Sequence, residues 1–260
     1  MMSQINDFAM EVQRNIELAG KDRDFLGLSN IWIRQAIQYN YAHNFTWLGR
    51  PILQVPQDIY AVQEIVWNVK PDLIIETGIA HGGSLILSAS LLACLDYCEA
   101  VERGGVLDPR ESRRRVIGID IEIRAHNRRA IETHPMAHLI EMIEGSSIDE
   151  DVIHYVRDVA KNYHRILVFL DSNHTHDHVL AELEAYAPLT SIGSYCVVWD
   201  TGLEDLPENF PTNRPWGKGN NPKTAVFAYL KKTDCFEIDK SIQNKLMITA
   251  SPEGFLRRVR

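Results

Sequence analysis

Acidic residues and a histidine follow two short apolar runs, where their side chains could meet a ligand. The run ILVFLD ends at Asp171, with His174 shortly after it, and the run YCVVWD ends at Asp200. If these runs are neighbouring parallel strands, their carboxylates lie side by side and repel each other unless a cation lies between them. Carboxylate, amide and water oxygens suit Mg²⁺, whereas an added histidine would admit other divalent metals. We therefore predict a divalent metal site. The alternative is that Asp171 caps a helix and Asp200 is only solvated.

The segment DSNHTHD carries two histidines, His174 and His176. An imidazole titrates near neutrality and can accept a proton from a hydroxyl group. His174 is close enough in sequence to Asp171 to reach the same cleft. We predict that His174 is a general base, and the alternative is a structural histidine.

A glycine-rich segment, ETGIAHGGS, follows another apolar run and opens a predicted helix. Glycine lets the backbone approach a ligand closely, and the free N–H groups of a helix start can face an anion. The spacing G-x-x-x-G-G differs from the G-x-G-x-x-G of dinucleotide oxidoreductases. Glu76 would repel a pyrophosphate and suits an ammonium group, which methionine-like ligands carry beside a carboxylate. The alternative is a tight turn without a ligand.

Two further strand ends could hold a nucleoside. Asp120 ends the run RVIGID, and an acid at this place can accept hydrogen bonds from ribose hydroxyls. Ser147, in the segment EGSS, could line an adenine pocket or cap the next helix. Aromatic residues lie in two loops, with Trp47 in the first and Trp216 in the long loop 207–223. Long loops in compact domains often bind ligands, and aromatic faces suit a sugar ring, although ordinary packing is the alternative.

Short apolar runs alternate with amphipathic helices over most of the chain. We expect strands at residues 72–77, 115–120, 139–143, 166–171 and 195–200, and C-terminal strands at 236–238 and 246–249. This alternation predicts an α/β fold with a doubly wound, mostly parallel sheet, which binds ligands at the carboxyl ends of its strands. We assign residues 58–260 to this domain, with Asp58 capping its first helix. Residues 1–57 form an N-terminal helical extension and a substrate-side loop.

The composition is that of a globular protein, with 260 residues, 45% of them hydrophobic and 24% charged. A net charge of −8 argues against nonspecific binding to nucleic acid or an anionic membrane. Residues 79–95 are apolar but interrupted by His81, glycines and serines, so we expect a buried helix and no transmembrane segment. No secretory leader is visible, and four cysteines are too few for a disulfide scaffold. We expect a cytoplasmic protein in which Cys94 and Cys98 are buried.

Several motifs in a fixed order resemble those of a known family. They are PDLIIETGIAHGGS, VIGIDI, MIEGSS, LDSNHTHDHV and PWGKGNNPKTAV. Together they make the chain, from about residue 44 onward, similar to the cephalosporin hydroxylase family, whose fold and metal site are those of S-adenosylmethionine-dependent O-methyltransferases and which includes rhamnosyl O-methyltransferases. The resemblance implies a Rossmann-like class I methyltransferase fold, with S-adenosylmethionine and Mg²⁺ or another divalent cation as cofactors. The implied reaction is methyl transfer to a hydroxyl of a sugar or other hydroxylated natural product.

The resemblance also implies roles for individual residues. The S-adenosylmethionine positions are Glu76, Gly78, His81, Ser84, Asp120, Ser147 and Asp171. The metal positions are Asp171 and Asp200. Some members have Glu-Asp where this chain has Trp199-Asp200, so the third metal ligand is open among Asn173, His174 and Thr201, and we assign Thr201 to the metal site. His174 takes the place of the lysine base of catechol-type methyltransferases. The expected substrate-side residues are Trp47, His176, Trp216 and Asn220.

Three other functions can be weighed against the sequence. A metal-dependent hydroxylase would need an iron triad, which His174, His176 and Asp171 could imitate, and a nicotinamide oxidoreductase would need the missing G-x-G-x-x-G. A noncatalytic binding protein on the same fold would be expected to lose the acids and histidine at the strand ends. We expect a small-molecule or glycan substrate and no nucleic acid. We also expect a homo-oligomer, formed through the apolar N-terminal helices.

Overall fold

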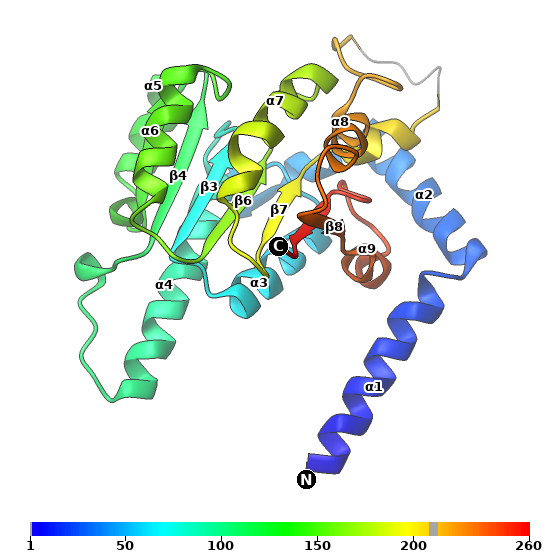
Figure 1. The fold of residues 1–260 in the computed structure, drawn as a ribbon, viewed down its shortest axis with the longest axis horizontal. Helices are drawn as coiled ribbons and strands as arrows, with labels where there is room; N and C mark the ends of the chain where they lie inside the picture. Colours follow the sequence, from blue (N-terminus) through cyan, green and yellow to red (C-terminus); the bar gives the residue numbers. More distant parts are fainter. Residues whose placement is uncertain (1, 208–212) are drawn as a thin grey trace.

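A seven-stranded sheet forms the centre of the computed structural model, which describes residues 2–207 and 213–260 (Figure 1). The strand order is β5-β4-β3-β6-β7-β9-β8. The strands are β3 (Leu73–Thr77), β4 (Arg115–Asp120), β5 (Ile140–Glu144), β6 (Ile166–Leu170), β7 (Tyr195–Val198), β8 (Phe236–Ile238) and β9 (Phe255–Arg258). Strands β3 to β7 run parallel to one another, and β9 is antiparallel to its neighbours β7 and β8. The predicted doubly wound, mostly parallel sheet is confirmed.

Helices cover both faces of the sheet, which explains why the central strands β3, β6 and β7 are largely apolar on both faces. The helices are α3 (Pro56–Val69), α4 (Gly83–Arg103), α5 (Ala125–Glu132), α6 (Glu150–Ala160), α7 (His176–Tyr186), α8 (Pro222–Leu230) and α9 (Lys240–Leu246). Successive side chains of a strand point to opposite faces. Ile74 accordingly packs in the core that includes α3 and α4, whereas Leu73 and Ile75 pack in the core that includes α6, α7 and α8.

The order of connections reverses between β3 and β6, and this reversal locates the ligand site. From β3 the chain moves outward to β4 and β5, and it then crosses to β6 and β7 on the other side. Open α/β sheets bind ligands at such a point. Thr77 pairs with Leu170, so Gly78 and Asp171 leave the sheet side by side. Gly78 has φ +89°, and a Cβ there would lie 2.1 Å from the backbone oxygen of Asp171, so this close approach requires glycine.

The N-terminal segment lies beside the carboxyl end of β7. It consists of α1 (Met2–Ala19), α2 (Arg23–Gln38), a 3₁₀ turn η1 (Tyr41–Asn44) and a hairpin of β1 (Phe45–Trp47) and β2 (Arg50–Ile52). Helix α1 extends away from the sheet and contacts α9 (Figure 1). Helix α2 instead faces the 3₁₀ turn η5 (Thr201–Asp205), which follows β7.

Some local expectations were wrong. Residues 246–249 do not form a strand, because Leu246 ends α9 and packs in the core, while Phe255 and Leu256 of β9 pair with β7. Asp58 does not cap α3, which begins at Pro56 and has Val55 at its N-cap, since proline suits the first helical turn. Ser147 does not cap α6 either, because the side chain of Asp149 does so.

Helix α4 is the one described helix that is long and apolar enough to cross a membrane. Its side chains Leu85, Ile86 and Leu92 are fully buried, so in this domain it is a core helix. The helix extends to Arg103, beyond residue 95, where the apolar stretch ends. Cys94 lies on its exposed side, and Cys98 is partly exposed, so the expectation that both are buried was wrong.

Candidate active site

Two carboxylates and one imidazole meet at the carboxyl ends of β6 and β7. Ligand atoms of Asp171, His174 and Asp200 all lie within 4.8 Å of one another. His174 Nε2 is 3.2 Å from Asp200 Oδ2, and their side chains are 16% and 41% exposed. Burial first, and then the negative charge of Asp200, hold the pKa of Asp171 well above its usual range. A donor set of this kind fits a divalent cation, which would offset the repulsion between the carboxylates.

The other two candidates for a third metal ligand are engaged elsewhere. Asn173 Oδ1 accepts hydrogen bonds from the backbone N–H and the hydroxyl of Thr175. Thr201 is fully buried, and its hydroxyl donates to the carbonyl of Pro252 at 2.7 Å. His174 is therefore the third side chain that the structure brings to the two carboxylates, and the role of Thr201 as a ligand stays a prediction.

A set of hydrogen bonds holds Asp200 in place. Asp200 has φ +56°, a left-handed backbone conformation that is unfavourable for most residues. The next two residues attach this turn to the segment before β9, through the Thr201 hydroxyl and through a hydrogen bond from Gly202 N to Ala250 O at 3.0 Å. The buried Asp58 of α3 in turn accepts a hydrogen bond from Ala250 N at 2.9 Å. Asp58 thus anchors the segment that fixes the Asp200 turn.

A small cavity adjoins this cluster at the switch point between β3 and β6. Glu76, Gly78, Ser84 and Asp171 line it, and so does Gln54, which precedes α3. Its volume is about 10 Å³, enough for one water-sized group. Gln54 Oε1 is buried and has no hydrogen-bond partner there. A donor-only group such as an ammonium would match the unpaired carbonyl of Gln54 and the carboxylate of Glu76.

Glu76 is buried, and this burial decides its charge. Desolvation raises the pKa of Glu76 to about 7, against the smaller opposing effect of hydrogen bonds from Ser88 and Ser84. The carboxyl group therefore ionises readily when a cation arrives beside it. Sequence reasoning had found Glu76 but not Gln54, which lies in the turn-rich stretch before α3 and has no motif signal of its own.

The loop between β3 and α4 is held by polar side chains from three directions. Asp120 Oδ2, at the end of β4, accepts hydrogen bonds from the backbone N–H groups of Ile79 and Ala80 at 2.8 and 3.1 Å. The guanidinium of Arg50 donates to the carbonyl of His81 at 2.6 and 3.0 Å. Asn127 Nδ2 donates to the carbonyl of Ala80 at 2.9 Å. Asp120 therefore positions the loop, while its proposed contact with ribose stays a prediction.

Ser147 belongs to a polar cluster that the sequence did not predict. Its hydroxyl lies 3.0 Å from His178 Nε2, which is also 3.2 Å from the hydroxyl of Ser172. The Ser172 hydroxyl donates to Glu182 Oε1 at 2.6 Å. Glu182, on helix α7, is fully buried. The spacing of His178 and Glu182, one helical turn apart on the inner face of α7, was the signal that could have revealed this cluster.

The long loop places Trp216 against His174. The two rings meet edge to face with centroids 4.9 Å apart. Asn220, from the same loop, accepts a hydrogen bond from the backbone N–H of His176 at 2.8 Å. The ring of His176 contacts the hydroxyl of Thr224 at 2.8 Å and is not part of the metal cluster. Among the described residues that cluster has one histidine, so the iron triad with His174 and His176 is not assembled.

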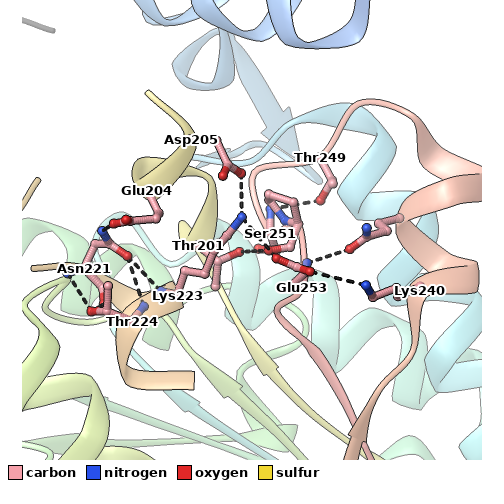
Figure 2. A network of polar contacts seen from close by, with 12 residues as sticks. Thr201, Glu204, Asp205, Asn221, Lys223, Thr224, Lys240, Thr249, Ser251 and Glu253 are labelled. Carbon is pink, nitrogen blue, oxygen red and sulfur yellow. Dashed lines mark hydrogen bonds and ion pairs between the residues drawn. The ribbon is translucent and has the colours of Figure 1, made fainter. Parts of the chain in front are cut away.

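Both ends of this loop are fixed by the polar network in Figure 2. Glu204 accepts hydrogen bonds from Gly219 N at 2.8 Å and from the side chain of Asn221. Lys223, although buried, forms ion pairs with Asp205 at 2.6 Å and Glu253 at 3.4 Å. The network therefore holds the ends of the loop that carries Trp216. The central residues 208–212 of the predicted loop lie outside the described residues.

Trp47 lies apart from this group. Its side chain packs against the core, and its indole N–H donates to the hydroxyl of Ser90 on α4 at 2.9 Å. The structure thus gives Trp47 a packing role, while its part in binding the substrate stays a prediction.

A protein family and individual known proteins both match most of this chain. Residues 39–259 match the Rhamnosyl O-methyltransferase/CmcI family. A Rhamnosyl O-methyltransferase of Mycobacterium tuberculosis is 28% identical over 82% of this chain and 78% of its own length. One from Mycobacterium leprae is 28% identical over 82% of each chain.

Solved structures show the same fold. A structure of CmcI with Mg and SAM has a TM-score of 0.53 and 19% identity, and covers 84% of this chain and 78% of its own. A structure of apo CmcI has a TM-score of 0.52 at the same identity, and covers 84% of this chain and 77% of its own. At this level of identity the likeness concerns the arrangement of helices and strands.

Proposed function

Because this chain belongs to the Rhamnosyl O-methyltransferase/CmcI family of S-adenosylmethionine-dependent O-methyltransferases, we propose that it methylates a hydroxyl of a sugar or other hydroxylated natural product with the help of a divalent cation. The match of residues 39–259 to this family confirms the resemblance predicted from the sequence motifs. The observation that carries the proposal is the cluster of Asp171, His174 and Asp200 beside the cavity of Glu76 and Gln54. The related rhamnosyl O-methyltransferases support a sugar as the acceptor.

The side chains of the site have different proposed roles in the reaction. Glu76 and Gln54 would receive the ammonium group of S-adenosylmethionine, while Asp171 and Asp200 would hold the cation. When bound, the cation would stabilise negative charge on the acceptor oxygen. His174 would take the proton of the acceptor hydroxyl as its oxygen receives the methyl group. The fixed positions of these groups align donor and acceptor, and such alignment contributes up to about 7–11 kcal/mol in favourable cases.

Self-association and a cytoplasmic location are part of the same proposal. The exposed side chains of Phe8 and Met10 on α1, a helix that extends from the body of the molecule, support contact with a second copy. The measurement is the mass of the full chain in solution by light scattering, where a monomer at all concentrations would contradict self-association.

Removal of the metal tests the central claim. We expect S-adenosylhomocysteine to bind the chain with a stoichiometry of one, as measured by calorimetry. Turnover of S-adenosylmethionine with a panel of rhamnosides should stop in chelator and return when Mg²⁺ is added, because the two carboxylates are then neutralised again. The mass of the product distinguishes methylation from hydroxylation, since methylation adds CH₂ and hydroxylation adds one oxygen. Absence of S-adenosylhomocysteine binding would refute the proposed function, and full turnover in chelator would remove the metal from it.

The affinity for S-adenosylhomocysteine should depend on pH through Glu76. Because burial raises the pKa of Glu76 to about 7, the side chain is largely neutral below that pH and ionised above it. The ammonium group binds the ionised form, so binding should be strong above neutrality and weaken as the pH falls through 7. Between about pH 8 and about pH 6 we expect a loss of about tenfold, set by the ionised fraction.

Calorimetry without metal measures this effect. Glu76→Gln should bind more weakly at both pH values and lose most of the pH dependence. Glu102→Gln is the matched control, since Glu102 is an exposed acid near the end of α4. Equal affinity of the unaltered protein at both pH values would show that Glu76 does not bind the ammonium group.

A further inference from the structure

An apolar cavity lies between the N-terminal segment and the turn after β7. Trp32, Ile33 and Ala36 of α2 line one side, and Leu203 and Leu206, in and after η5, line the other. Its volume is about 170 Å³. For comparison, an engineered apolar cavity of about 150 Å³ stays dry and binds benzene. The cavity is therefore large enough for a six-membered ring or a short alkyl group.

Aromatic contacts fix the wall of this cavity. The ring of Trp32 meets that of Tyr41 edge to face at 5.0 Å, and Tyr41 meets Phe45 at the same distance. Such pairs stabilise one arrangement of the rings. This wall of the cavity is thus ordered before a ligand arrives, which lowers the cost of ordering the site on binding.

The cavity adjoins the metal cluster at Asp200, which belongs to both. Asp200 lines the cavity, and its carboxylate also lies 3.2 Å from His174 Nε2. A molecule that presents a hydroxyl to His174 and Asp200 would therefore have its adjoining atoms within reach of the apolar wall. Among the described residues that line the cavity, His43 is the one basic side chain and there is no lysine or arginine, while Asp200 would repel an anion.

We propose that this cavity is the subsite for an uncharged apolar part of the methyl acceptor, a ring or alkyl group next to the hydroxyl that receives the methyl group. The inference rests on the proposed function and narrows its substrate class to amphiphilic acceptors. Burial of that apolar part would supply affinity that a bare sugar lacks. The lining disfavours an acceptor that would place a phosphate or carboxylate here.

Fluorobenzene is a suitable probe, because its binding can be followed by fluorine NMR whether or not the natural acceptor is known. The full chain is first loaded with S-adenosylhomocysteine and Mg²⁺. We expect fluorobenzene to bind, and phenyl α-L-rhamnoside to displace it at concentrations about tenfold lower than methyl α-L-rhamnoside, since the phenyl ring removes more apolar surface from water. Ala36→Leu, which fills the cavity, should weaken the binding of both aromatic probes by about tenfold or more.

Gln35→Leu is the matched control, since it adds a leucine one position earlier on the exposed side of α2. It should leave fluorobenzene binding unchanged, and S-adenosylhomocysteine should bind both variants with the affinity of the unaltered protein, which shows that they are folded. The proposal is overturned if fluorobenzene does not bind, if the two rhamnosides compete equally, or if Ala36→Leu has no effect. If α2 were buried against a second copy of the chain, fluorobenzene would not bind. If S-adenosylhomocysteine did not bind the unaltered protein, the proposed function would be refuted instead.

Discussion

Asp171→Asn should lower the rate of methyl transfer by about 10³-fold, the size of effect seen when a central electrostatic contact is removed from an active site. Asp171 and Asp200 carry the negative charge that would hold the cation, and asparagine keeps the shape of the side chain while removing its charge. The hydrogen bond from the Asp171 backbone N–H to the carbonyl of Thr77, at 3.0 Å, does not depend on the side chain. The strand end should therefore stay in place, and S-adenosylhomocysteine should bind almost as before.

The measurements for Asp171→Asn are kcat at saturating Mg²⁺ and the Mg²⁺ dependence of the rate. Asp177→Asn makes the same change in charge on the exposed first turn of α7 and should leave the rate nearly unchanged. If Asp171→Asn turned over fully in chelator, the carboxylate and the cation would have no part in the reaction.

His174→Ala is expected to lower kcat by about 10²- to 10⁴-fold, the range for removal of a general base. His174 Nε2 lies at the cluster, and the ring of Trp216 limits its motion on one side. Because the proposed role concerns proton transfer in the reaction, KM for the acceptor should change only modestly. The Mg²⁺ affinity should also persist, since the two carboxylates remain.

His154→Ala is the control, because His154 is exposed on α6 and distant in sequence from the cluster. Two other outcomes would reject the general-base role. A large rise in KM at constant kcat would assign His174 to acceptor binding, and a large loss of Mg²⁺ affinity would make it a metal ligand. The structure places His174 where each role is chemically reasonable, so these kinetic constants decide between them.

The sequence predicted the sheet well because its signals are local. Each buried strand needs a continuous apolar run, and parallel strands need helices between them, so runs such as ILVFLD and RVIGID identified β6 and β4. The prediction from sequence failed where one local pattern is compatible with more than one structure. The run at residues 246–249 has the composition of a strand, but the pairing of Phe255 and Leu256 with β7 occupies that place in the sheet.

The sequence by itself determined the family, the α/β fold and the acids and histidine at the strand ends, because motif order and hydrophobic periodicity are properties of neighbouring residues. Only the tertiary structure decided which of these side chains meet. The adjacency of β6 and β7 brought Asp200 to Asp171 and His174, whereas the hydroxyl of the buried Thr201 donates a hydrogen bond to the carbonyl of Pro252. Gln54 lies beside Glu76, and α2 lies beside Asp200, although these segments are far apart in the chain. Such contacts depend on packing in three dimensions, which no local sequence pattern specifies.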